Sequence, residues 1–96
     1  MKKTTTYKGY DLEDAHFYSC NNKPGLENDE LCGCFYCLKI YRPKEIQDYV
    51  FADNNIDRYG TALCPWCGID SVIGKYSGYP ITHDFLKAMR KRWFDE

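Results

Sequence analysis

Four of the six cysteines in this sequence are arranged as two C-x-x-C pairs, a spacing typical of metal sites. Cys34 and Cys37 form the first pair, Cys64 and Cys67 form the second, and 26 residues separate them. Two residues between thiolates allow a tight turn, or knuckle, to direct both sulfurs at one ion, and two such turns complete a tetrahedral all-sulfur shell. The pattern therefore predicts a four-cysteine metal site.

The second pair lies in the stretch C-P-W-C-G, whose residues suit a turn that carries two sulfurs. Pro65 stiffens the turn, and Gly68 permits a positive φ and leaves space beside the sulfurs. The alternatives are two disulfides, free buried thiols, or a thioredoxin-type redox pair at the start of a helix. The paired spacing and the strand-like residues after Cys37 make these alternatives weaker than a metal site.

Zinc is the metal that we expect at the two knuckles. It accepts four tetrahedral sulfurs without a redox change, and a closed shell of this kind is structural rather than catalytic. Iron is the alternative, because the double knuckle resembles the rubredoxin pattern, whose second half also reads C-P-x-C-G. Rubredoxins usually carry glycine after the first pair as well, whereas Leu38 stands there in this chain. An iron electron carrier is therefore the second hypothesis.

Two cysteines and one histidine have no place in this pattern. Cys32 lies two residues before Cys34, a spacing that cannot form the same knuckle. It could be an alternative ligand, a thiol beside the site, or a small hydrophobic residue. His16 and Cys20 are four residues apart on one helical face, which could hold a second metal, but we prefer packing against the core as their role.

No catalytic set emerges, because no nucleophile has a histidine and an acid partner in a recognisable motif. A treble-clef nuclease would need a general-base histidine beside the knuckles, and none lies between Cys37 and Cys64. The sequence therefore favours a non-enzymatic module that binds a protein or a nucleic acid.

Two features could form such a binding surface. Aromatic side chains occupy the knuckle tips, where they could contact a partner or fill the small core. A basic run at residues 87–92 could contact phosphate or an acidic partner, or could be the solvated face of a helix. The aromatic residues are Phe35, Tyr36 and Trp66, and the basic ones are Lys87, Arg90, Lys91 and Arg92.

The length of 96 residues suits one domain with a thin hydrophobic core, for which a metal site can act as a staple. The net charge of −1 excludes the strongly basic class of nucleic-acid binders. No apolar stretch follows the N-terminal lysines, and no apolar run of about 18 residues occurs, so we expect neither a signal peptide nor a membrane span. We expect a reducing, cytoplasmic location, where cysteines favour metal chemistry over disulfides.

Three short helices are expected around the knuckles. Asp11 and Thr82 are N-cap residues of the first and the last, and Pro43 suits the first turn of the middle one. The expected helices span residues 11–20, 42–51 and 82–94. The middle helix has an apolar stripe of Ile46, Tyr49 and Val50, and the last has one of Phe85, Leu86, Met89 and Trp93.

The remaining segments are expected to be strands and loops. Residues 31–41 indicate a strand of a hairpin around the first knuckle, and residues 61–80 indicate strands around the second. Residues 21–30 are polar and contain Pro24 and Gly25, which predicts a loop.

The stretches CGCFYCLKIY, GTALCPWCGIDSVIG and SGYPITHDFL are similar to a group of small bacterial cytoplasmic proteins of uncharacterised function. These proteins share a zinc-ribbon-like double knuckle. The similarity runs from about His16 to Phe94, and Trp66 stands where tyrosine is more usual. The resemblance implies a cytoplasmic location, one compact domain and the four cysteines of the two knuckles as ligands, and it implies no activity.

We therefore predict a single small metal-stapled α+β domain over residues 11–96, preceded by a flexible arm over residues 1–10. Its fold class is zinc-ribbon or rubredoxin-like, with β-hairpins that carry the knuckles and about three short helices packed around them. The partner is an unidentified protein or nucleic acid and not a membrane, and the sequence does not define the oligomeric state. The predicted ligands of Zn²⁺, with Fe as the alternative, are Cys34, Cys37, Cys64 and Cys67.

Overall fold

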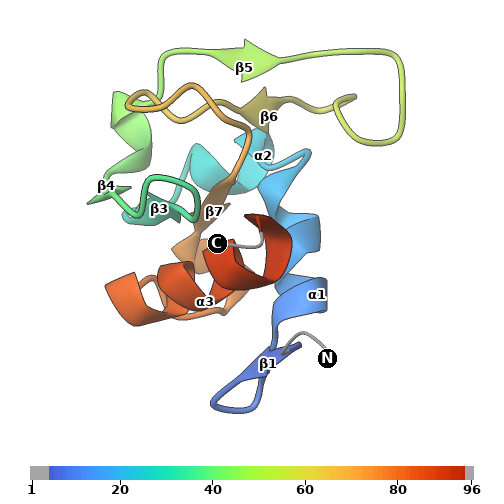
Figure 1. The fold of residues 1–96 in the computed structure, drawn as a ribbon. Coiled ribbons are helices and arrows are strands. Elements are labelled where there is room, and N and C mark those ends of the chain that lie inside the picture. Colours follow the sequence, from blue (N-terminus) through green and yellow to red (C-terminus); the bar gives the residue numbers. More distant parts are fainter. Residues whose placement is uncertain (1–4, 95–96) are drawn as a thin grey trace.

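Three helices and three small antiparallel sheets make up residues 5–94, the part of the chain that this computed structural model describes (Figure 1). The helices are α1 (Leu12–His16), α2 (Lys23–Leu26) and α3 (His83–Phe94), with 3-10 turns η1 (Phe17–Ser19), η2 (Pro43–Glu45) and η3 (Lys75–Ser77). The strands are β1 (Thr6–Tyr7), β2 (Tyr10–Asp11), β3 (Cys32–Cys34), β4 (Ile40–Tyr41), β5 (Tyr49–Val50), β6 (Thr61–Ala62) and β7 (Val72–Gly74). The expected small α+β fold is confirmed, and its zinc-ribbon or rubredoxin-like class stays a prediction.

The sheet β4-β3-β7 separates two cores. Its central strand, β3, pairs antiparallel with both neighbours. Because successive side chains of a strand point to opposite faces, Cys32 and Cys34 face one core and Gly33 faces the other. A Cβ atom at residue 33 would lie 2.7 Å from Cδ1 of Leu86. Glycine therefore allows α3 to pack closely against the middle of the sheet.

We name the two cores by their contents. The helix core contains buried residues of α1 and α3 together with three residues from outside these helices, and its members are Leu12, Ala15, Phe35, Ile73, Ile81, Phe85, Leu86 and Met89. The cysteine core, on the other face of the sheet, contains Leu26, Cys32, Cys34, Tyr41, Ile46, Ala62, Cys64 and Val72. Two of the expected metal ligands, Cys34 and Cys64, thus belong to a buried cluster, and Cys37 and Cys67 pack against it.

The C-terminal helix α3 forms where the sequence predicts it. The Thr82 hydroxyl accepts a hydrogen bond of 3.2 Å from the backbone N–H of Phe85, as an N-cap residue does. Phe85, Leu86 and Met89 of the predicted stripe are buried, and Trp93 is half-buried. The helix is shown in orange to red in Figure 1, and its buried residues share the helix core with Ile73 of β7.

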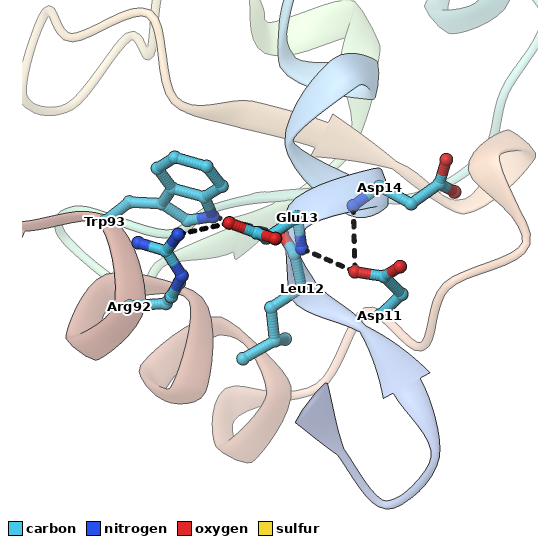
Figure 2. A network of polar contacts seen from close by, with 6 residues as sticks. All are labelled: Asp11, Leu12, Glu13, Asp14, Arg92 and Trp93. Carbon is cyan, nitrogen blue, oxygen red and sulfur yellow. Dashed lines mark hydrogen bonds and ion pairs between the residues drawn. The ribbon is translucent and has the colours of Figure 1, made fainter. Parts of the chain in front are cut away.

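The first predicted helix, at residues 11–20, is confirmed as α1 followed directly by η1. The carboxylate of Asp11 accepts hydrogen bonds from the backbone N–H groups of Glu13 at 2.9 Å and Asp14 at 3.1 Å (Figure 2). These bonds satisfy two of the N–H groups that a helix leaves unpaired at its start. The predicted N-cap is therefore correct.

The end of α3 is held against the start of α1 by two polar contacts (Figure 2). The Arg92 guanidinium forms an ion pair with the Glu13 carboxylate. The indole N–H of Trp93 donates a hydrogen bond of 3.0 Å to the carbonyl of Leu12. These contacts join segments about eighty positions apart in the chain and hold together the two helices that enclose the helix core.

A short hairpin precedes α1. Strands β1 and β2 pair through Thr6 with Asp11 and through Tyr7 with Tyr10. The Tyr7 and Tyr10 rings both lie edge-on to the buried ring of Phe85, with centroids 6.2 and 6.3 Å away. Part of the expected arm therefore packs on α3, because its tyrosines bury area against an aromatic core. The flexibility of residues 1–10 stays a prediction, and residues 1–4 lie outside the described part.

The prediction of a loop throughout residues 21–30 is wrong, because four of these residues form α2. Pro24 lies in the first turn of α2, where a helix does not need the missing N–H. Leu26 is buried in the cysteine core and anchors the turn. At Gly25 an added Cβ would lie 2.4 Å from the Tyr76 ring, so the glycine permits close packing and does not break the helix.

The prediction of a helix at residues 42–51 is also wrong beyond its first turn. Pro43 begins the 3-10 turn η2, but Ile46 is extended, with φ −71° and ψ 127°, and the chain continues into β5. Tyr49 and Val50 then pair with β6. Aromatic and β-branched side chains suit a strand. Pairing with β6 therefore favours a strand over a helix at Tyr49 and Val50.

Candidate metal centre

The sulfur atoms of Cys34, Cys37, Cys64 and Cys67 lie within 4.8 Å of one another. The distance is 3.6 Å between Cys34 and Cys67 and 3.7 Å between Cys37 and Cys64. An ion with four tetrahedral bonds of about 2.3 Å to sulfur holds its ligands about 3.8 Å apart, whereas the two sulfurs of a disulfide are about 2.0 Å apart. The cluster therefore fits four ligands of one metal ion and does not fit two disulfides.

The two knuckles have the same backbone geometry. In the first, Leu38 donates its N–H to the carbonyl of Cys34, and in the second Gly68 donates to Cys64, both at 2.8 Å. The residue after each pair has a positive φ, 70° at Leu38 and 80° at Gly68. Leu38 thus occupies the left-handed conformation that glycine usually supplies, so its departure from the rubredoxin pattern leaves the turn unchanged.

Replacing Gly68 with alanine is expected to lower the free energy of unfolding by about 1–2 kcal/mol, the cost of a left-handed backbone for a residue with a Cβ. The new Cβ would meet no atom within 4 Å, so only the backbone contributes. Gly78→Ala is the matched control, because Gly78 has φ +87° and equally open surroundings away from the cysteines. Chemical denaturation of both variants measures the free energy of unfolding. A much larger decrease for Gly68→Ala than for Gly78→Ala would contradict an effect of the backbone conformation alone.

Backbone N–H groups point at the first sulfur of each knuckle. Cys34 Sγ lies 3.4 Å from the N–H of Tyr36 and 3.5 Å from that of Cys37, and Cys64 Sγ lies 3.4 Å from that of Trp66. Such donors stabilise a thiolate more than a thiol. Both turns therefore favour the charged form that a metal ion binds.

The burial of the four sulfurs is uneven. Cys34 at the end of β3 and Cys64 just after β6 are buried, whereas Cys37 and Cys67 are half-buried. The first cysteine of each knuckle thus lies inside the cysteine core, and the second lies toward solvent.

Opposing effects act on the pKa of the Cys64 thiol. Burial raises it, but the neighbouring Tyr41 hydroxyl and then the backbone N–H groups of Trp66 and Cys67 lower it, and the net pKa lies below the ordinary value. At Cys37 burial dominates and raises the pKa to about 11. Of the Cys37 and Cys64 thiols, that of Cys64 is therefore the one that ionises more readily.

Cys32 lies outside the four-sulfur cluster. Its side chain is fully buried in the cysteine core, and burial raises its pKa to about 12. A cysteine that is fully buried in apolar surroundings is chemically inert. Of the three roles considered for Cys32, the structure favours the small hydrophobic residue.

His16 and Cys20 do not form a second cluster with other ligands. The His16 ring lies against Trp93, with centroids 4.1 Å apart, and near Phe35 at 6.0 Å. The Cys20 thiol is 3.3 Å from the carbonyl of Phe17. Within residues 5–94 neither belongs to a group of three or more potential metal ligands. Packing is thus the role that the structure supports for His16.

The aromatic residues at the knuckle tips have different surroundings. Phe35 is buried in the helix core. The half-buried Tyr36 ring lies 4.9 Å from Phe94 and 5.2 Å from the Arg90 guanidinium. Trp66 is 57% exposed, with the Lys39 ammonium 5.0 Å above its ring. Only Trp66, of these three, presents most of its surface to solvent.

The basic run on α3 is only partly available to a partner. Arg92 is paired with Glu13 and lies over the Trp93 ring at 4.3 Å. Arg90 is half-buried beside Tyr36. Lys87 and Lys91 are exposed. The arginines therefore serve packing as well as charge.

Two hydroxyl groups beside the sulfurs were not identifiable from the sequence. The Ser71 hydroxyl lies 3.0 Å from the sulfur of Cys34. The Tyr41 hydroxyl is buried in the cysteine core near Cys64. Neither belongs to a spacing pattern, and only the pairing of β3 with β4 and β7 brings them to the site.

Comparison of the chain with protein-family models, with curated proteins and with solved structures found no match. The resemblance to small bacterial proteins therefore stays a prediction, as does the cytoplasmic location. No helix within residues 5–94 has the length and the apolar character needed to cross a membrane.

Proposed function

We propose that this protein is a small zinc-binding module whose metal is structural, held in a zinc-ribbon-like double knuckle. One observation carries the proposal, namely the gathering of the four sulfurs of Cys34, Cys37, Cys64 and Cys67 at separations that suit a single tetrahedral ion. The two knuckles are far apart in the chain, so an ion between them would tie β3 and β4 to the segment between β6 and β7.

The surroundings of the cluster support a structural role. Four cysteine ligands complete the coordination of zinc and leave no position for a substrate. Each knuckle contributes its first cysteine to the cysteine core, so the ion would add to the stability that a thin core provides. The fit of sulfur positions holds for iron as well, and the choice of zinc rests on its preference for a closed, redox-inactive shell.

The proposal extends to a role in binding a protein or a nucleic acid without catalysis. The exposed indole of Trp66 at the tip of the second knuckle supports this, because a large exposed aromatic side chain is a common centre of a binding surface. Trp66→Ala should leave the melting temperature unchanged and abolish capture of the protein or nucleic acid that the module binds. Capture that is unaffected would exclude Trp66 from the binding surface.

Metal analysis of the natively purified protein, combined with its visible spectrum, tests the function. We expect one zinc ion per chain and no absorption in the visible range. A red protein that contains iron and bleaches reversibly on reduction would instead establish the electron-carrier alternative. Protein without stoichiometric metal, but with the four thiols of the cluster free to react, would refute both.

A further inference from the structure

We propose that the hydroxyl groups of Ser71 and Tyr41 retain the metal by donating hydrogen bonds to the two buried sulfurs, one on each knuckle. The inference rests on the proposed function, since it requires a metal ion at the cluster. It assigns to these two residues the task of positioning and charge compensation for Cys34 and Cys64, which the N–H groups of the turns perform only in part.

Ser71 is held at the site by the backbone. Its side chain is 1% exposed, and its carbonyl accepts a hydrogen bond of 3.0 Å from the N–H of Phe35. The next residue, Val72, begins β7 opposite Cys34. This places the Ser71 hydroxyl 3.0 Å from the Cys34 sulfur. A metal-bound thiolate has no proton, so the hydroxyl must be the donor in this contact.

Tyr41 approaches the other knuckle. It lies in β4 opposite Cys32, and its side chain is 6% exposed within the cysteine core. Its hydroxyl oxygen is buried and makes no well-formed hydrogen bond with any described residue. Tyr41 and Cys64 belong to the same buried cluster of side chains. Burial and then the Cys64 sulfur raise the pKa of this hydroxyl. A buried donor without a partner is costly, and a thiolate at Cys64 would supply the partner.

The chemistry of the site explains why the hydroxyls serve these two sulfurs. A divalent ion with four thiolates has a net charge of −2, which a buried environment disfavours. The half-buried sulfurs of Cys37 and Cys67 can accept hydrogen bonds from water. Water does not reach the buried sulfurs of Cys34 and Cys64 in the same way, so protein donors must replace it. Ser71 and Tyr41 are the side chains placed to do so.

Ser71→Ala and Tyr41→Phe remove one hydroxyl each and test the proposal. Competition with a chelator should show that each variant binds zinc about 10–100-fold more weakly, the usual effect of losing a group that supports a ligand. In the cobalt-substituted protein the sulfur-to-metal charge-transfer band should move to longer wavelength, because a thiolate without its hydrogen bond gives up electron density more easily. Loss of stability alone would not move this band.

Ser19→Ala and Tyr49→Phe are the matched controls. Ser19 is a buried serine whose hydroxyl donates to the carbonyl of His16, and Tyr49 packs against the cysteine core. Both control variants should keep the wild-type affinity and spectrum. Unchanged affinity and spectrum in both test variants would overturn the inference and leave the metal site standing. A wild-type protein that binds no metal would instead refute the proposed function itself.

Discussion

Replacing Cys64 with serine is expected to release the metal ion and to unfold the protein at room temperature. Serine keeps the size of the side chain but offers no thiolate, so the shell loses one of its four ligands. The binding free energy of a structural zinc ion is about 10–16 kcal/mol, which is comparable with the whole stability of a typical small domain of about 5–15 kcal/mol. Metal content and far-UV circular dichroism measure the two effects.

Cys20→Ser is the control for this prediction. Cys20 is half-buried and lies outside the four-sulfur cluster, so its variant should retain one metal ion and a wild-type melting curve. A Cys64→Ser protein that melts like the wild type would show that the cluster does not stabilise the fold. Unfolding of both variants alike would indicate a general sensitivity to cysteine replacement.

Replacing Asn22 with alanine is expected to lower the free energy of unfolding by about 3–5 kcal/mol, because three backbone groups, two of them in buried hydrogen bonds, would lose their partner. The Asn22 side chain is fully buried. Its amide N–H₂ group donates to the carbonyls of Tyr18 at 3.1 Å and Val72 at 2.9 Å, and its carbonyl accepts from the N–H of Ala62 at 2.9 Å. One amide thus joins η1, β6 and β7.

Asn55→Ala is the matched control for Asn22. The side chain of Asn55 is exposed and makes none of the hydrogen bonds observed within residues 5–94, so its removal should change stability by less than about 0.5 kcal/mol. Urea denaturation of the two metal-loaded variants measures the difference. Equal stabilities would mean that water replaces the Asn22 amide without cost, contrary to the burial observed here.

Local signals in the sequence were sufficient for the knuckles and for the helices at the two ends of the described chain. The cysteine spacing predicts the four residues whose sulfurs gather in the structure. Asp11 and Thr82 cap helices as expected, since an N-cap depends only on residues two or three positions away. The apolar stripe of α3 follows from the helical period.

Features that depend on distant partners could not be predicted. Tyr49 and Val50 have a helical spacing after Pro43, yet they form a strand because β6 lies beside them. In the sequence, Asn22 is one of several polar residues in an expected loop. Only the folded chain shows that its amide forms hydrogen bonds with residues 40 and 50 positions away.

Dependence on distant partners also explains why the two hydroxyl groups of the candidate site could not be predicted from the sequence. Ser71 and Tyr41 lie beside the sulfurs because β3 pairs with β7 and β4, and sheet pairing has no signature in the spacing of a serine or a tyrosine. The assignment of Cys32 to packing likewise required its burial to be known.

X-ray absorption at the metal edge of the natively purified protein is the direct test of the four-sulfur site, because it reports the atoms bound to the ion. We expect a zinc edge with four sulfur neighbours at about 2.3 Å and no nitrogen or oxygen neighbour. A shell with fewer than four sulfurs, completed by nitrogen or oxygen, would contradict the assignment of Cys34, Cys37, Cys64 and Cys67 as its ligands.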